Sequence, residues 1–286
     1  MSDQLFSKWA SESRQVRKNI IKMIHYAASG HPGGSLSMVE ILFSLMAEGG
    51  VMRHSPVTPS HPDRDRLILS KGHGVPALYA LYHHCGYDIT NEELMTLRAL
   101  ESRLQGHPDR VRIPYLEAST GSLGQGASFA QGVAMGYKLN GIDKRVYCIV
   151  GDGEMQEGQI WEAGLSSAHH KVNNLTIILD YNKAQIDGHI DEVLSLEPVK
   201  DKWLAFGFHL HEVDGHSYQQ LTTALRDTHP TKPSMIIAHT IKGRGVPFME
   251  GKVDWHGKAP NSNELELALN SIEENSTIGL QGGANG

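Results

Sequence analysis

Long apolar runs are absent from this chain of 286 residues. None approaches the roughly 18–20 consecutive apolar residues that a membrane-spanning helix needs. The segment 1–18 is polar and charged, so it also lacks the apolar core of a secretory signal peptide. We therefore expect no membrane span, and we take the cytoplasm as the predicted location.

Cysteine and excess charge are also scarce. Cys85 and Cys148 are far apart and stand among apolar residues, which predicts two buried free thiols and no need for an oxidising compartment. The net charge is −6, and no block of like charges stands out. Nothing in the charge pattern therefore indicates a nucleic-acid partner.

Two common nucleotide-binding signatures are missing as well. The glycine-rich stretch Gly121–Gly126 precedes an expected helix, but Phe129 stands where a dinucleotide fingerprint needs its third glycine. No Walker A sequence is present. NAD and ATP are therefore disfavoured as ligands, and the stretch by itself fits a plain turn at the start of a helix equally well.

What is present is the composition of an ordinary globular protein, with 40% hydrophobic and 20% charged residues. Expected strands alternate with expected helices, which predicts an α/β fold with a mostly parallel sheet and helices on both faces. We expect one domain over residues 1–276. The segment 277–286 contains four glycines and is expected to be a disordered tail.

Apolar periodicity locates the main elements. It predicts strands at 67–69, 145–150, 175–180 and 234–239, and helices at 6–29, 37–46, 76–85, 127–139 and 217–228. Capping boxes are expected at Thr90–Glu93 and Ser217–Gln220. Residues 49–66, 101–118 and 241–260 are expected to be loops. Small residues in 127–139 predict close packing against the sheet or another subunit.

The segment 145–188 carries the strongest chemical signal. An apolar strand leads into Gly151-Asp152-Gly153, a helix follows, and a second apolar strand leads to Asn182. A carboxylate and an amide thus end two strands, at the edge where open α/β sheets bind ligands. Such oxygen ligands suit Mg²⁺, and glycines before a helix start accommodate phosphate. The pattern predicts a diphosphate held through a divalent cation, although the three-residue turn alone is common.

Four histidines stand beside glycine or proline in expected loops: His31, His73, His107 and His256. Imidazole can donate or accept protons near neutral pH, so such residues suit acid–base chemistry. Each one alone also fits a solvated loop histidine. No pair among them has the i, i+4 spacing of helical metal ligands.

Together these features resemble the thiamine diphosphate motif of transketolases, with Asn182 thirty residues after Asp152. The resemblance implies that Asp152, Asn182 and the carbonyl of Ala184 hold Mg²⁺, for which Ca²⁺ or Mn²⁺ are potential substitutes. Gln156-Glu157-Gly158 favours transketolases over 2-oxo acid dehydrogenases. With the HPGGS loop at residues 31–35, it also counts against deoxyxylulose phosphate synthase.

The resemblance further assigns residues to the site. The residues implied to bind thiamine diphosphate are His73, Gly121, Leu123, Gly151, Asp152, Gly153, Glu157, Asn182, Ile186 and His256. The implied catalytic residues are His31, His73, His107, His256 and Glu157. Among these, His31 and His107 are expected to hold substrate hydroxyls, and Glu157 to join a carboxylate network across a dimer interface. Lys71 and Tyr181 depart from the common family pattern, and Lys71 is expected to alter the charge near the diphosphate.

The resemblance runs from about Ser13 to Pro260 and covers only the N-terminal part of a full-length transketolase. The family's second domain holds the aminopyrimidine ring and most of the sugar's distal phosphate, and no stretch of this sequence is left to form it. We therefore expect the N-terminal subunit of a split transketolase, inactive alone and completed by a second chain as α2β2. The complex would move a two-carbon ketol unit from a ketose phosphate to an aldose phosphate.

Two alternatives stay open. The complex could use an unusual sugar, sulfonated or branched, because the distal contacts are expected on the partner chain. The chain could also be a non-catalytic subunit that binds thiamine diphosphate. The retention of His31 and His107 counts against this second alternative, since a binding module needs only the metal and phosphate ligands.

Overall fold

In this computed structural model, which describes residues 3–275, five parallel strands form one sheet in the order β1-β2-β3-β5-β4. The strands are β1 (Arg66–Leu69), β2 (Val146–Gly151), β3 (Leu175–Tyr181), β4 (His209–Asp214) and β5 (Ser234–His239). Every residue of β2 and β3 is buried, as expected for central parallel strands with covered faces. The predicted α/β class is confirmed.

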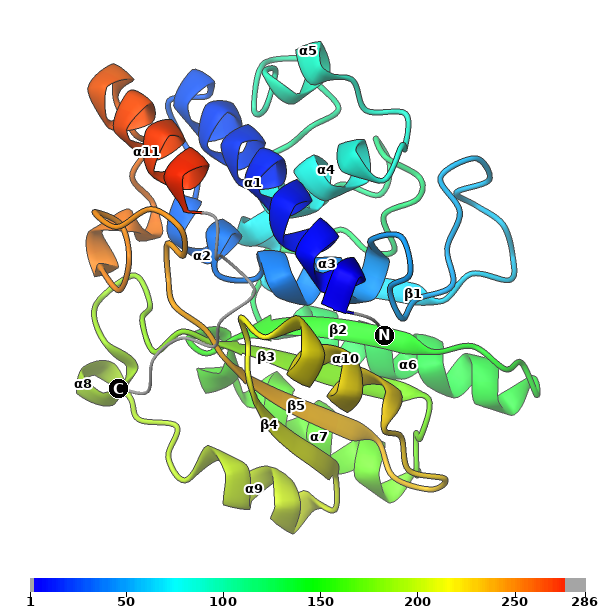
Figure 1. Ribbon diagram of the computed structural model, residues 1–286. Coiled ribbons are helices and arrows are strands. Elements are labelled where there is room, and N and C mark those ends of the chain that lie inside the picture. Colours follow the sequence, from blue (N-terminus) through cyan, green and yellow to red (C-terminus); the bar gives the residue numbers. More distant parts are fainter. Residues whose placement is uncertain (1–2, 276–286) are drawn as a thin grey trace.

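Helices cover the sheet on two sides (Figure 1). On one side lie α6 (Gln125–Leu139), α7 (Gly158–His169) and α9 (Val199–Phe206), over one apolar cluster. On the other side lie α1 (Asp3–Tyr26), α3 (Val39–Met46), α4 (Val75–His84) and α10 (Tyr218–Arg226), over a second, larger cluster. The shorter or peripheral helices are α2 (Pro32–Leu36), α5 (Asn91–Leu94), α8 (Ile190–Val193) and α11 (Ser262–Glu274).

Helix α6 lies unusually close to the sheet at its first turn. A Cβ atom added to Gly126 would stand 2.4 Å from Ser70 Oγ, so only glycine permits this approach to the end of β1. Further along the helix Ala127, Ala130 and Ala134 are buried against the sheet. The predicted close packing of this helix is therefore made with the sheet.

The structure adds one strand and four helices to the expected elements. Strand β4 and helices α2, α8, α9 and α11 were not predicted. Strand β4 reads HLHEVD and lies at the edge of the sheet. Edge strands can carry polar side chains, so the alternation of apolar and polar residues that predicts a strand is weak here. Helix α11 begins with a complete capping box between Asn261 and Glu264, a signal that was overlooked.

Smaller predictions had mixed outcomes. Thr90 and Ser217 accept the expected bonds from the backbone N–H groups of Glu93 and Gln220. In a complete capping box the Glu93 and Gln220 side chains would also accept from the backbone N–H groups of Thr90 and Ser217. Here Glu93 instead pairs with Arg103, and the Gln220 side chain accepts from Asp214 N. Cysteine behaves nearly as expected, with Cys148 buried, Cys85 half-buried and both free. The predicted tail 277–286 lies outside the described residues.

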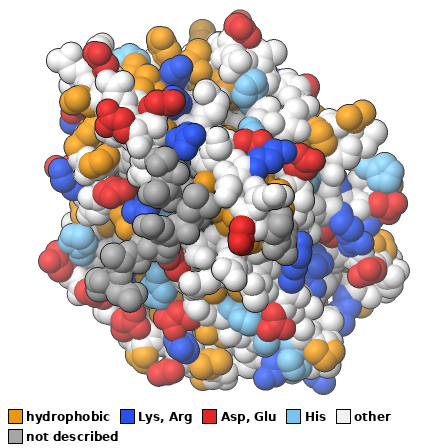
Figure 2. Space-filling view, in the orientation of Figure 1, with side chains coloured by type: hydrophobic (Ala, Val, Ile, Leu, Met, Phe, Trp, Pro, Cys, Tyr) orange, Lys and Arg blue, Asp and Glu red, His pale blue; other side chains and the backbone are white. Residues whose placement is uncertain are grey.

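Surface properties of the described part add two observations. No helix within residues 3–275 is long and apolar enough to cross a membrane. The face shown in Figure 2 intersperses acidic, basic and apolar side chains. Charge on this face therefore does not mark out a docking patch of one sign.

A buried polar network crosses the larger apolar cluster. Glu40 in α3 accepts from Arg17 in α1 at 2.5 Å, and both side chains are fully buried. His216 Nδ1 donates to the other Glu40 oxygen at 3.0 Å, while its Nε2 accepts from Ile241 N at 2.8 Å. Burial alone would raise the pKa of Glu40, but the Arg17 charge and the His216 bond hold it below its ordinary value. The network thereby ties two helices to the loop after β5.

Replacing Glu40 with alanine should therefore lower the free energy of unfolding by about 3–5 kcal/mol, since it leaves the Arg17 charge buried without its partner. Chemical denaturation of the purified chain measures this change. Lys200→Ala removes an exposed ion pair with Glu212 and should leave the unfolding free energy close to that of the parent. Equal losses for the two variants would contradict the role given to Glu40.

Candidate active site

A cavity of about 370 Å³ opens at the carboxyl edge of the sheet. All residues assigned to the site from the sequence line it: His31, His73, His107, Gly121, Leu123, Gly151, Asp152, Gly153, Glu157, Asn182, Ala184, Ile186 and His256. Gly34, Lys71, Glu154, Gln156, Gln185, Asp187 and Lys242 line it as well. The structure thus brings these residues together from distant parts of the chain, while their individual roles stay predictions.

The parallel register places the two expected oxygen ligands side by side. Gly151 at the end of β2 pairs with Asp180 near the end of β3, so Asp152 and Asn182 follow neighbouring strand ends. Asp152 Oδ1 accepts from Gly153 N at 2.8 Å and its Oδ2 accepts from Lys183 N at 2.5 Å. These bonds hold the Asp152 carboxylate in the turn, facing the cavity.

The Asp152 carboxylate lacks full compensation for its negative charge. Burial and the nearby charge of Asp180 raise the pKa of Asp152 to about 6, against the lowering effect of the Gly153 bond and two lysines. Asn182 Oδ1 stands close to the same turn and accepts from Ala184 N at 3.3 Å. The donor set of one carboxylate, one amide and one backbone carbonyl is suited to a hard divalent cation.

Two buried lysines give the cavity its positive charge. Lys71 Nζ donates to Gly34 O at 3.0 Å and forms a buried ion pair with Asp180. Lys242 Nζ donates to Ala184 O at 2.9 Å and lies 3.0 Å from His256 Nδ1. Burial and the charge of Lys71 lower the pKa of Lys242 to about 8. Two cations held this close together favour an anionic group in the cavity.

Lys242 was missed by the sequence analysis, which treated 241–260 as a glycine-rich loop. Its signal was available, because Ile241-Lys242-Gly243 follows a strand end, as Asp152 does. The backbone needs that glycine, since Gly243 has a φ of +77°. Gly243 N also donates to Gly33 O at 3.0 Å, which joins the loop to the segment that carries His31.

Glu154 forms the floor of the cavity and was also missed. It is buried, and its Oε1 accepts from Ser70 Oγ and, at 2.9 Å, from Gly124 N. Its Oε2 accepts from Gly151 N at 3.1 Å. Burial raises the pKa of Glu154 although these bonds act to lower it. One carboxylate therefore holds together the ends of β1 and β2 and the start of α6.

The four predicted histidines converge on the cavity. The ring of His31 lies with its centroid 5.2 Å from that of His73, 5.4 Å from that of His256 and 6.3 Å from that of His107. Burial and nearby positive charges lower the pKa of His31 to about 4 and that of His256 to about 3. The pKa values of His73 and His107 are also lowered, mainly by burial. These shifts favour the neutral form of each ring, and a neutral imidazole has one nitrogen that can accept a hydrogen bond.

Close backbone contacts set the spacing around these rings. Gly121 has a φ of +136°, and a Cβ added there would lie 2.7 Å from His107 Cδ2. A Cβ added to Gly72 would lie 2.8 Å from Gly121 N. Any side chain at Gly121 would thus displace the His107 ring. At the opposite rim, Glu157 and Ile186 are exposed to solvent, Ile186 by 66%.

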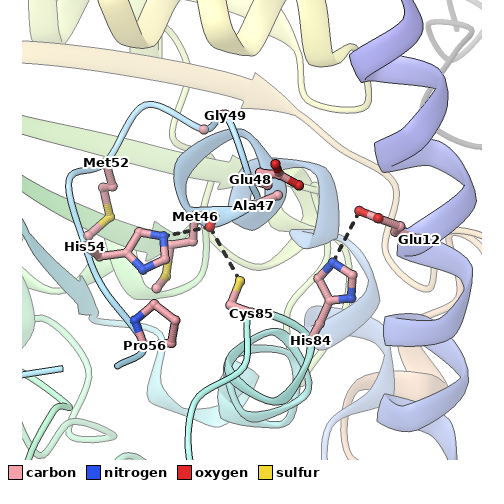
Figure 3. A pocket seen from close by; sticks show the side chains of 11 residues that line it. Glu12, Met46, Ala47, Glu48, Gly49, Met52, His54, Pro56, His84 and Cys85 are labelled. Carbon is pink, nitrogen blue, oxygen red and sulfur yellow. Dashed lines mark hydrogen bonds and ion pairs between the residues drawn. The ribbon is translucent and has the colours of Figure 1, made fainter. Parts of the chain in front are cut away.

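A second cavity, of about 480 Å³, lies between α1, α3 and α4 (Figure 3). Its polar groups already satisfy one another. His84 pairs with Glu12 at 3.3 Å, while His54 Nε2 and Cys85 Sγ each contact Met46 O, at 2.7 and 3.4 Å. This cavity therefore lacks the convergent uncompensated groups that mark the first one.

The lowered pKa of His31 has a measurable effect on stability. Between about pH 4 and pH 6.5 the unfolded chain holds a proton on this ring that the native state does not, so stability should fall as pH falls through this window. His31→Gln should reduce the number of protons taken up on unfolding by up to about one. Urea unfolding at several pH values between 4 and 7 measures this number. The same pH dependence in variant and parent would show that His31 titrates normally.

Comparison with known proteins identifies the family of this chain. The family model described as transketolase, thiamine diphosphate binding domain, matches residues 10–274. A 6-deoxy-6-sulfo-D-fructose transketolase subunit of Clostridium sp. (strain MSTE9) is 40% identical over 265 residues, 92% of this chain and 95% of that protein. An apulose-4-phosphate transketolase subunit of Actinobacillus succinogenes is 38% identical over 271 residues, 94% of this chain and 97% of that protein.

Two longer proteins match this chain over only part of their own length. The crystal structure of transketolase from Campylobacter jejuni superposes with a TM-score of 0.86 at 33% identity, over 99% of this chain and 45% of that one. Human transketolase is 37% identical over 91% of this chain and 41% of its own length. The chain thus spans less than half the length of these proteins but nearly all of the two shorter relatives above. It belongs to the transketolase family and corresponds to that family's thiamine diphosphate binding domain.

Proposed function

We propose that this chain is the N-terminal, diphosphate-binding subunit of a two-chain transketolase, which transfers a two-carbon ketol unit from a ketose phosphate to an aldose phosphate. One observation carries the proposal: the oxygen ligands of Asp152, Asn182 and Ala184 share a cavity with two buried lysines and four neutral histidines. Such a cavity suits a diphosphate bound through a metal ion, next to groups that handle hydroxyls and protons.

The metal would be held by the Asp152 carboxylate, the Asn182 amide oxygen and the Ala184 carbonyl. The raised pKa of Asp152 supports this assignment, because a divalent cation supplies the positive charge that the carboxylate lacks. The Ala184 oxygen already accepts from the Lys242 cation, so it presents a lone pair to the cavity. Mg²⁺ suits an all-oxygen set of this kind, and Ca²⁺ or Mn²⁺ could replace it.

The diphosphate would lie against Lys71, Lys242 and the backbone of Gly151, Gly153 and Gly121, with His73 and His256 beside it. Glycines at these positions keep side chains away from the phosphate oxygens. The lowered pKa of Lys242 indicates that the site favours added negative charge. Leu123 and Ile186 would provide apolar contacts to the remainder of the coenzyme.

Thiamine diphosphate supplies an electron sink for breaking a carbon–carbon bond next to a carbonyl, and the protein must orient it. The residues of this chain would bind substrate and move protons around it. His31 and His107 face the cavity and would hold substrate hydroxyls, while His73 and His256 would act nearer the diphosphate. Because the rings are neutral, each can accept a proton at its free nitrogen. Glu157, at the exposed rim, would join a carboxylate network at a subunit interface.

A second chain would complete the site. The relatives that match this chain over nearly their whole length are named as transketolase subunits, and the rim at Glu157 and Ile186 is exposed. The partner would supply the pyrimidine-binding wall and the contacts to the distal end of the sugar, and two copies of each chain would assemble. The same relatives are named for 6-deoxy-6-sulfo-D-fructose and apulose 4-phosphate, which favours an unusual sugar as a second candidate substrate.

Asp152→Ala should abolish Mg²⁺-dependent binding of thiamine diphosphate by the assembled complex. The loss should be at least about 100-fold, because even partners outside the ligand shell contribute about 10–100-fold to metal affinity. Calorimetric titration of the coenzyme with and without EDTA measures it. Asp143→Ala, at a fully exposed carboxylate, is the matched control and should bind as the parent does. Unchanged affinity in Asp152→Ala would remove the metal assignment.

The purified chain alone should show negligible ketol transfer, and adding the pyrimidine-binding subunit should restore it. The reason is that one wall of the site, with its proton-transfer group, would be missing, and such a group contributes roughly 10²–10⁴ in rate. The assay pairs ketose phosphate, sulfonated ketose and branched ketose donors with aldose phosphate acceptors. Full turnover by the lone chain would contradict the two-chain proposal. Coenzyme binding without turnover of any donor by the complex would favour the non-catalytic alternative.

A further inference from the structure

A cluster of polar side chains lies at the edge of the sheet, away from the carboxyl edge that forms the cavity. His209 and His211 are alternate residues of the edge strand β4 and so point to the same side. Val213, the next residue on that side, packs in the same apolar cluster as Leu221 of α10. The two histidines therefore face α10, and Asp227, the residue that ends this helix, lies against them.

The three side chains form a nearly equilateral triangle. His209 Nε2 and His211 Nε2 lie 3.1 Å apart, and each lies 3.2 Å from Asp227 Oδ2. All three side chains are partly exposed, by 26%, 23% and 56%. Within residues 3–275, this is the one group of three or more His, Cys, Asp or Glu residues close enough to share a metal ion.

Hydrogen bonds alone do not satisfy this triangle. If both Nε2 atoms carry protons and donate to Asp227, two N–H groups confront each other at the 3.1 Å edge. If one Nε2 is bare, its lone pair confronts the carboxylate oxygen at 3.2 Å. One edge is therefore repulsive in either case. A cation between the three atoms offsets this repulsion, because each atom can then direct a lone pair at the cation.

The separations also fit metal coordination. Ligand bonds of about 2.0–2.2 Å place neighbouring ligand atoms about 2.8–3.1 Å apart in octahedral geometry and about 3.3–3.6 Å apart in tetrahedral geometry. The observed separations of 3.1 and 3.2 Å lie at or between these ranges. Two imidazoles and one carboxylate suit Zn²⁺, Ni²⁺ or Co²⁺ much better than Mg²⁺.

We propose that His209, His211 and Asp227 bind a divalent transition-metal ion, with Zn²⁺ as the reference ion, and so fasten the end of α10 to the edge strand. The remaining coordination positions face solvent and a hollow of about 380 Å³ beside His211. His229 lies nearby but outside the triangle, with its ring centroid 5.7 Å from that of His209 and its Nδ1 accepting from Thr231 N.

The test is a titration of chelator-treated protein with Zn²⁺ and Co²⁺ in the presence of excess Mg²⁺, which fills oxygen-lined sites. The parent should bind one Co²⁺ per chain with visible absorption from imidazole coordination, and Zn²⁺ should displace it and raise the Tm. His211→Asn and Asp227→Asn should each lower Zn²⁺ affinity by at least about 100-fold. Asp227 is exposed, so its variant should fold even if the His211 variant does not.

Two controls separate this site from other binding. His239→Asn removes a histidine of the neighbouring strand that pairs with Glu212 at 2.9 Å, and it should bind Zn²⁺ as the parent does. Asp152→Ala should also keep the site, because the cavity at the carboxyl edge is separate. Absence of Co²⁺ binding in the parent, or equal Zn²⁺ affinity in Asp227→Asn and the parent, would overturn the proposal.

Discussion

The site depends on one buried carboxylate, that of Asp180 at the end of the central strand β3. Its side chain is fully buried, and burial alone would raise its pKa, yet the Lys71 ion pair and bonds from Ser37 and Thr240 hold the pKa below its ordinary value. Lys71 follows β1, Ser37 lies between α2 and α3, and Thr240 follows β5. An unpaired buried carboxylate costs several kcal/mol, so these three segments must converge. Their convergence is what forms the cavity.

This convergence also sets the electrostatics of the cavity. Lys71 forms an ion pair with Asp180. The positive charge of Lys242 and the incompletely compensated negative charge of Asp152 can therefore interact with a bound group. The surrounding histidines are neutral because burial and these cations disfavour further positive charge. Anchoring and chemistry are thus divided between the lysines and carboxylates that line the cavity and the imidazoles around them. The buried network of Arg17, Glu40 and His216 also supports this arrangement. His216 accepts a hydrogen bond from Ile241 N and so fixes the loop that carries Lys242.

The parts of the site that the sequence predicted are those with local signals. Asp152 and Asn182 each follow an apolar strand directly, so the strand pattern and the parallel topology suffice to bring them together. Glu154 had no such signal, because its role comes from Ser70, 84 positions away, and from the backbone of Gly124. Lys242 did have a local signal, since it follows the end of a strand, but its contact with Ala184 across 58 positions could not be read from that signal. Strand β4 was missed because only Val213 among its six residues is buried, and the polar residues include the two histidines of the triangle.

The exposed rim formed by Glu157 and Ile186 has a consequence for the order of events in the proposed assembly. Glu154 joins the inner ends of β1, β2 and α6 into a rigid floor, so the rim is the natural entrance for a coenzyme. The second chain would cover that entrance. Coenzyme would then load faster before the subunits dock than after, and the population of complete enzyme would follow the supply of thiamine diphosphate as well as the supply of the partner.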